Sequence, residues 1–162
     1  MSTVPTAVNR KPALLIDCFG TISNRHYFWY SLEVLAYRLH LRRKLYVIAP
    51  EVVPVLRQLK PDYLLVFFSN SYHPWMYRGI TAQGLDDLFD HIVISSEVRS
   101  RKPGEKIFRQ ALTRIQRLPE ECTLIDNAAR NNRTATRIGM QTVHFTSQHQ
   151  LYEILRKRAQ KA

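Results

Sequence analysis

The sequence predicts a doubly wound α/β domain, in which a parallel sheet of about five strands carries helices on both faces. Short apolar segments alternate with amphipathic segments along the chain, which is typical of βα units. No internal repeat or low-complexity segment interrupts this order. With 162 residues, the chain has the length of one ordinary domain and can bury a substantial core. These observations favour a single sheet covered by helices.

Five apolar segments have the length and composition of buried strands. The first is Ala13–Ile16, which ends at Asp17 and is followed by a turn at Gly20. The second, Tyr63–Phe68, is continuously apolar or aromatic, as strands buried on both faces are. The remaining predicted strands are 91–95, 122–125 and 141–145.

Helices are predicted between the strands from periodicity and from start and stop signals. Leucines and an alanine recur at helical spacing within 27–41, and Pro50 opens the next helix. Gly139 is placed to end a helix that starts at Asn131. The predicted helices are 27–41, 51–60, 103–116 (starting at Pro103 or Gly104), 131–138 and 149–157, and the aromatic segment 72–75 is expected to be a loop.

The charge of the chain is its least ordinary global property. Lysine and arginine total 24 against 13 acidic residues, which gives a net charge of +11 and a pI near 10.1. Such an excess favours phosphorylated or polyanionic ligands, although it also fits a plainly basic, soluble protein. The apolar segments are too short to span a bilayer, and residues 1–12 lack the apolar core of a secretory signal. With two cysteines, we expect a cytoplasmic or organellar interior rather than secretion.

Polar and charged residues follow four of the predicted strands. In doubly wound sheets, ligands bind outside the carboxyl ends of the strands, so side chains at these exits are expected to converge on one pocket. The residues at these exits are Asp17 after the first strand, Ser69 and Asn70 after the second, Lys102 beyond the third, and Asp126 and Asn127 after the fourth.

Four ordered segments resemble the signature motifs of the haloacid dehalogenase (HAD) superfamily, subfamily I. Residues 16–21 read I-D-C-F-G-T, like the first motif D-x-x-G-T, and residues 68–71 read F-S-N-S, like the second. The third motif, K-P-x-x-x-I-F, is similar to 102–108, and the fourth is similar to 124–140. The likeness extends from about Ala13 to Phe145, and the ordered set is far more specific than any single motif.

This resemblance implies a phosphoryl-transfer site. A carboxylate at the first motif can attack phosphorus and form a covalent intermediate, and the phosphoryl oxygens then need donors and positive charge around them. By resemblance, Asp17 and Lys102 are catalytic, Thr21, Ser69, Asn70 and Lys102 bind phosphate, and Asp17, Asp126 and Asn127 hold Mg²⁺.

The chain also departs from the family pattern at three places. Phosphatases of this family carry a second aspartate two residues after the nucleophile as general acid and base, but this chain has Phe19 there. Asn127 puts an amide where a carboxylate metal ligand is expected, which predicts weak Mg²⁺ binding. Between the first two motifs, residues 22–50 allow only a much reduced helical cap, which disfavours a small haloacid substrate.

Two functions follow from these features. The first is a HAD-type hydrolase with weak or atypical activity on a phosphorylated small or macromolecular substrate. The second is a catalytically degraded domain that serves as a basic binding or assembly module for nucleic acid, a ribonucleoprotein or an acidic protein. The predicted organisation is a flexible arm (1–12), the domain (13–155) and a basic tail (156–162), with a polyanion surface on the cap at Arg38, Arg42, Arg43 and Lys44.

Overall fold

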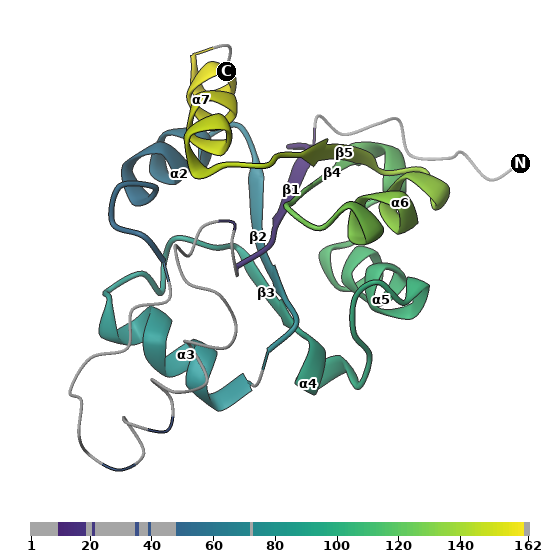
Figure 1. Ribbon diagram of the computed structural model, residues 1–162, viewed down its shortest axis with the longest axis horizontal. Coiled ribbons are helices and arrows are strands. Elements are labelled where there is room, and N and C mark those ends of the chain that lie inside the picture. Colours follow the sequence, from purple (N-terminus) through teal and green to yellow (C-terminus); the bar gives the residue numbers. More distant parts are fainter. Residues whose placement is uncertain are drawn as a thin grey trace, which may run out of the picture.

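The computed structural model describes residues 10–18, 21, 35, 39, 48–71 and 73–160 (Figure 1). Within these residues, five parallel strands form one sheet in the order β3-β2-β1-β4-β5, with helices on both faces, so the predicted fold class is confirmed. The strands are β1 (Ala13–Ile16), β2 (Leu64–Ser69), β3 (His91–Ile94), β4 (Cys122–Asp126) and β5 (Gln141–His144).

The described helices lie between and after the strands; four of them are close to predicted positions, and the two at 73–82 and 95–98 were not predicted. Helix α7 begins at an N-cap serine, Ser147, whose side chain accepts a hydrogen bond from the Gln150 backbone N–H. The helices are α2 (Val53–Leu59), α3 (His73–Ala82), α4 (Ser95–Val98), α5 (Glu105–Ile115), α6 (Ala129–Arg137) and α7 (Gln148–Ala159), and Pro119–Glu121 forms a 3₁₀ turn.

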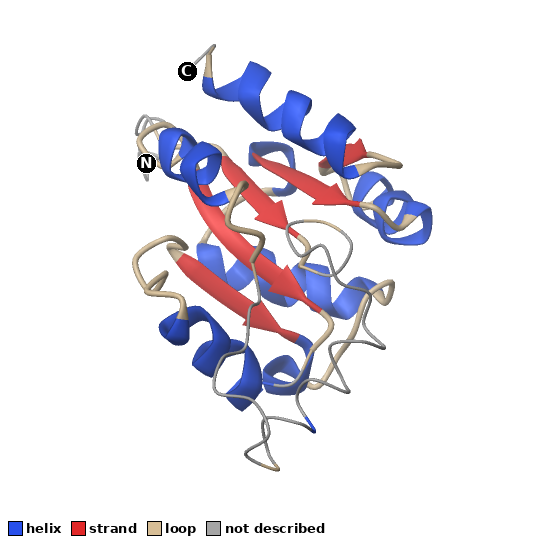
Figure 2. Ribbon diagram, turned by 60° about the vertical axis from the view of Figure 1, so that its left-hand side comes forward, coloured by secondary structure: helices blue, strands red, loops and turns tan. Residues whose placement is uncertain are grey.

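Strand β1 lies at the centre of the sheet and is buried on both faces. Ala13 aligns with Leu64 of β2 and with Cys122 of β4, so the carboxyl ends of these strands meet at one edge. Because side chains alternate along a strand, Leu14 and its partners pack under α2, α3 and α7, whereas Leu15 packs under α5 and α6 (Figures 1 and 2). These two apolar layers hold the central strands in place.

The segment after β2 differs from the prediction. The aromatic stretch 72–75 was expected to be a loop, but helix α3 begins at His73 and has Pro74 in its first turn, where a missing N–H costs nothing. Gly79 and the β-branched residues near the end of the helix give it weak intrinsic propensity. The helix forms because Met76 and Ile80 are fully buried in the core, so packing outweighs propensity.

Most of the predicted cap lies outside the described residues. Within it, the Leu39 backbone N–H donates to the Leu35 carbonyl at 2.9 Å, the spacing of an α-helical hydrogen bond. Both side chains are more than half exposed. Among the described residues, no helix is long and apolar enough to cross a membrane.

Candidate active site

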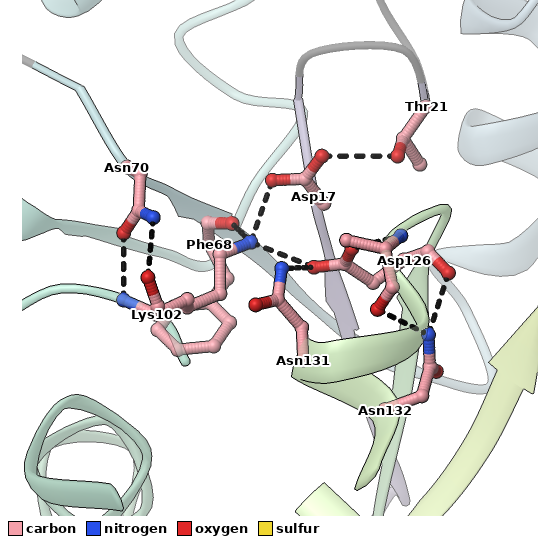
Figure 3. A network of polar contacts seen from close by, with 9 residues as sticks. Asp17, Thr21, Phe68, Asn70, Lys102, Asp126, Asn131 and Asn132 are labelled. Carbon is pink, nitrogen blue, oxygen red and sulfur yellow. Dashed lines mark hydrogen bonds and ion pairs between the residues drawn. The ribbon is translucent and has the colours of Figure 1, made fainter. Parts of the chain in front are cut away.

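The ammonium group of Lys102 is the centre of a buried polar network (Figure 3). Its Nζ donates to Asp17 Oδ1 at 2.5 Å, to Asp126 Oδ2 at 2.9 Å and to the Phe68 carbonyl oxygen at 2.9 Å. All three ammonium protons therefore have a partner. The acceptors come from the ends of β1, β4 and β2, so the structure brings Asp17, Lys102 and Asp126 together at the carboxyl edge of the sheet.

Burial sets the electrostatics of this network. Asp17 is 7% exposed, Lys102 2% and Asp126 0%. Burial raises the pKa of Asp17, Lys102 opposes the rise, and the neighbouring carboxylate of Asp126 adds to it. Burial alone would lower the pKa of Lys102, but the attraction of both carboxylates outweighs burial and raises it above its ordinary value. The lysine therefore stays protonated at neutral pH and favours the ionised form of Asp17.

The carboxylate of Asp17 is held from a second side by Thr21. The Thr21 hydroxyl donates to Asp17 Oδ2 at 3.0 Å, and both side chains are buried. The Asp17 backbone N–H also donates to the Ile125 carbonyl at 3.0 Å, which continues the β1–β4 ladder to the site. These bonds fix the orientation of the carboxylate before any substrate arrives.

Asn70 and Ser69 use their side chains differently. The Asn70 side chain accepts from the Lys102 backbone N–H at 2.8 Å and donates to the Lys102 carbonyl at 2.9 Å, as a paired strand would (Figure 3). This geometry makes Asn70 a positioning residue for Lys102. The Ser69 hydroxyl is fully buried and has no hydrogen-bond partner in the described part of the chain, which leaves it for a ligand or a water molecule.

Two asparagines that sequence reasoning missed hold Asp126. Asn131 Nδ2 donates to Asp126 Oδ2 at 2.9 Å, and Asn132 Nδ2 donates to the Asp126 carbonyl at 2.8 Å. The Ala128 backbone N–H completes the set with a 2.8 Å bond to Asp126 Oδ1. The sequence feature that could have identified them is the pair of adjacent asparagines in the first turn of the helix that follows β4. Together they attach the start of α6 to the site.

Residues 20–145 match the sequence profile of the haloacid dehalogenase-like hydrolase family. The chain belongs to this family. Two curated relatives are glyceraldehyde 3-phosphate phosphatases. The one from Methanopyrus kandleri is 32% identical over 98 residues, which are 59% of this chain and 42% of that protein. The one from Pyrococcus furiosus is 29% identical over 118 residues, which are 72% of this chain and 49% of that protein. The chain thus spans less than half the length of either relative.

Solved structures of HAD hydrolases share the fold. A HAD-superfamily hydrolase from Ehrlichia chaffeensis superposes with a TM-score of 0.66 at 15% identity, covering 94% of this chain and 99% of that one. A HAD family enzyme from Bacteroides thetaiotaomicron, in complex with magnesium and inorganic phosphate, gives 0.63 at 16% identity, covering 85% and 96%. At these identities the likeness supports the fold alone.

The donor set of this HAD site fits Mg²⁺. The ion prefers oxygen ligands and commonly uses one or two carboxylates, with water and substrate phosphate completing its shell. Asp17 and Asp126 supply two carboxylates whose combined charge exceeds that of Lys102 by one negative unit, and Asn131 Oδ1 is buried without a hydrogen-bond partner in the described residues. Among the described residues, no group of three or more His, Cys, Asp or Glu side chains that could hold a metal ion is found, here or elsewhere.

Several predicted positions are placed differently or lie outside the described residues. The sequence predicted a metal ligand at Asn127, but this residue is exposed, and its backbone carbonyl oxygen lies 3.2 Å from His144 Nε2. The other residue predicted as a metal ligand after β4, Asp126, is part of the buried network. Phe19 and the proposed polyanion residues Arg38, Arg42, Arg43 and Lys44 lie outside the described residues.

The two cysteines of this HAD domain are expected to be unreactive in the folded protein. Burial raises the pKa of Cys18 well above its ordinary value, with a further contribution from Asp17, and burial raises the pKa of Cys122 to about 12. At pH 8 the thiolate fraction of Cys122 is then about 10⁻⁴. We expect iodoacetamide to modify neither thiol in the native protein at pH 8 and both in urea. Rapid alkylation of Cys18 in the native protein would contradict this expectation.

Proposed function

We propose that this chain is a phosphatase that forms a covalent aspartyl phosphate at Asp17. The observation that carries the proposal is the buried Lys102 ammonium, which bonds to carboxylates from two separate strand ends at 2.5 and 2.9 Å. Isolating one lysine with two acidic groups in the protein interior is costly unless the arrangement has a use. The named activity of the two curated relatives supports phosphate-ester hydrolysis as that use.

The proposed reaction consists of two successive displacements at phosphorus, and each side chain of the site has a separate role in them. An Asp17 carboxylate oxygen attacks phosphorus and forms an O–P bond, while the bond from phosphorus to the ester oxygen breaks and that oxygen takes a proton from water. Water then attacks the same phosphorus, which releases inorganic phosphate and restores Asp17. Lys102 balances negative charge throughout, and the Ser69 hydroxyl, which has no hydrogen-bond partner among the described residues, is available to a phosphoryl oxygen. Mg²⁺ bound by Asp17 and Asp126 would neutralise charge on the phosphoryl group.

The residue at position 19 determines how fast these steps can be. A carboxyl group two residues beyond the nucleophile could donate a proton to the leaving group and then accept one from the attacking water, whereas Phe19 can do neither. A substrate whose leaving group needs no proton should therefore react in the first step, and the intermediate should hydrolyse slowly. We expect the aspartyl phosphate to accumulate.

The proposal is tested by trapping this intermediate. The protein is mixed with p-nitrophenyl phosphate and Mg²⁺, quenched in acid and analysed by mass spectrometry, with Asp17→Asn as the matched control. We expect the mass of one phosphoryl group to be added to the peptide that contains Asp17, and no addition to the control. An unmodified wild-type protein that also releases no p-nitrophenolate would contradict the proposal and leave a binding role as the better interpretation.

A further inference from the structure

A pocket of about 380 Å³, lined by serine, asparagine and arginine residues, lies beside the network, between the ends of β2 and β3. Its walls come from the segment after β2 and from the α4 region, which lie next to each other at the carboxyl edge of the sheet (Figures 1 and 2). The lining residues are Asn70, Ser71, Ser95, Ser96, Arg99, Ser100 and Arg101. Asn70 belongs both to the pocket and to the site, and the last lining residue, Arg101, directly precedes Lys102 in the sequence.

The walls of this pocket are connected by hydrogen bonds. The Ser71 carbonyl accepts from the Ser95 hydroxyl at 3.1 Å and from the Ser96 backbone N–H at 3.3 Å. On the other side, the double hydrogen bond between Asn70 and the Lys102 backbone joins the same two segments. The pocket is therefore built into the frame that positions Lys102.

Two observations indicate an anionic ligand. The guanidinium groups of Arg99 and Arg101 are exposed and form no ion pair or hydrogen bond with any described residue, unlike that of Arg114, which pairs with Glu97. The Ser71 hydroxyl is buried, with the residue 7% exposed, and lacks a hydrogen-bond partner among the described residues although it lines the pocket. Two guanidinium groups and a hydroxyl that have no partner in the described part of the chain suit phosphate or carboxylate oxygens.

We propose that this pocket binds a second anionic group of the same phosphorylated substrate, so that the preferred substrates are bisphosphates or phosphorylated acids. The inference rests on the proposed phosphatase function, because the first phosphate must lie at Asp17. The pocket lies between the ends of β2 and β3, and Asp17 follows the adjacent β1. Neighbouring strands are about 4.8 Å apart, so the two anionic groups should be separated by roughly 7–10 Å.

This separation can be measured with probes that do not react. Alkane bisphosphonates with three to six methylene groups are compared with the alkyl monophosphonates of the same length, by calorimetry with Mg²⁺ at fixed ionic strength. We expect one bisphosphonate of intermediate length to bind at least about tenfold more tightly than its monophosphonate, because it gains charge-assisted hydrogen bonds.

Substitutions in the pocket test which residues are responsible for the tighter binding of the bisphosphonate. Arg99→Ala combined with Arg101→Ala should remove the preference and leave monophosphonate binding nearly unchanged. The control pair, Arg133→Ala with Lys157→Ala, removes the same charge from exposed positions on α6 and α7 and should keep the preference. Ser71→Ala should weaken bisphosphonate binding without lowering Tm, because its hydroxyl has no hydrogen-bond partner to lose among the described residues. This variant decides the question if the double arginine variant does not fold.

The outcomes separate the inference from the function on which it rests. Equal affinities of mono- and bisphosphonates in the wild type, or a preference that survives both Arg99→Ala/Arg101→Ala and Ser71→Ala, would overturn the second-anion pocket and leave the phosphatase proposal standing. A wild-type protein that binds neither probe would overturn both. A preference lost equally in the control pair would show only the effect of net charge and would also refute the pocket.

Discussion

Replacing Lys102 with methionine should lower the free energy of unfolding by about 3–5 kcal/mol, the cost of removing one partner from a buried ion pair. Methionine fills similar space but leaves Asp17 and Asp126 facing each other without a cation, in a site where both side chains are at most 10% exposed. Any turnover should be lost as well, because the charge beside the nucleophile is gone. Urea denaturation followed by circular dichroism measures the first effect.

Lys106, on the helix that follows Lys102, provides a control for this substitution. Lys106 lies in the first turn of α5, is exposed and forms no ion pair with a described residue, so Lys106→Met should change the free energy of unfolding by less than about 0.5 kcal/mol. The loss of unfolding free energy caused by Lys102→Met should become smaller as the pH is lowered. Burial already raises the pKa of Asp17, and loss of Lys102 raises it further, so protonation removes a repelling charge as pH falls. Equal stability of the two variants would refute the central role of this lysine.

Replacing Phe19 with aspartate should raise turnover of alkyl phosphates by about 10²–10⁴-fold, the usual contribution of a positioned general acid and base. The gain should be small for p-nitrophenyl phosphate, whose leaving group needs little help from a proton. Such a pattern would place the effect in proton transfer rather than in binding. Steady-state kinetics on both substrates in the presence of Mg²⁺ measures it.

Phe19→Asn is the matched control for this gain, because asparagine has nearly the size of aspartate but cannot transfer the proton. It should leave alkyl phosphate turnover at the wild-type level. A wild-type rate that already lies in the common range of 1–10³ s⁻¹ on alkyl phosphates would mean that another group transfers the proton, and the interpretation of Phe19 would then be wrong.

The sequence was sufficient for the sheet, because buried strands in a parallel sheet are continuous apolar segments with a recognisable length. The order of the strand ends, together with the resemblance of four motifs to the family, also predicted that Asp17, Lys102 and Asp126 lie in one place, and their side chains do meet there. Helix α3 was missed because its helical conformation depends on burying Met76 and Ile80. Propensity and local turn signals carry no information about such long-range contacts.

Only the tertiary structure decided how the polar side chains divide their roles. Residues adjacent in sequence at a strand end point to opposite sides, so Asp126 is buried beside Lys102 while Asn127 is exposed. The bonds from Asn70 to the Lys102 backbone join residues 32 positions apart, and no sequence pattern specifies that pairing. The pocket with Arg99, Arg101 and Ser71 likewise exists only because β2 and β3 are neighbours in the sheet, which brings two separate segments of the chain to the same edge.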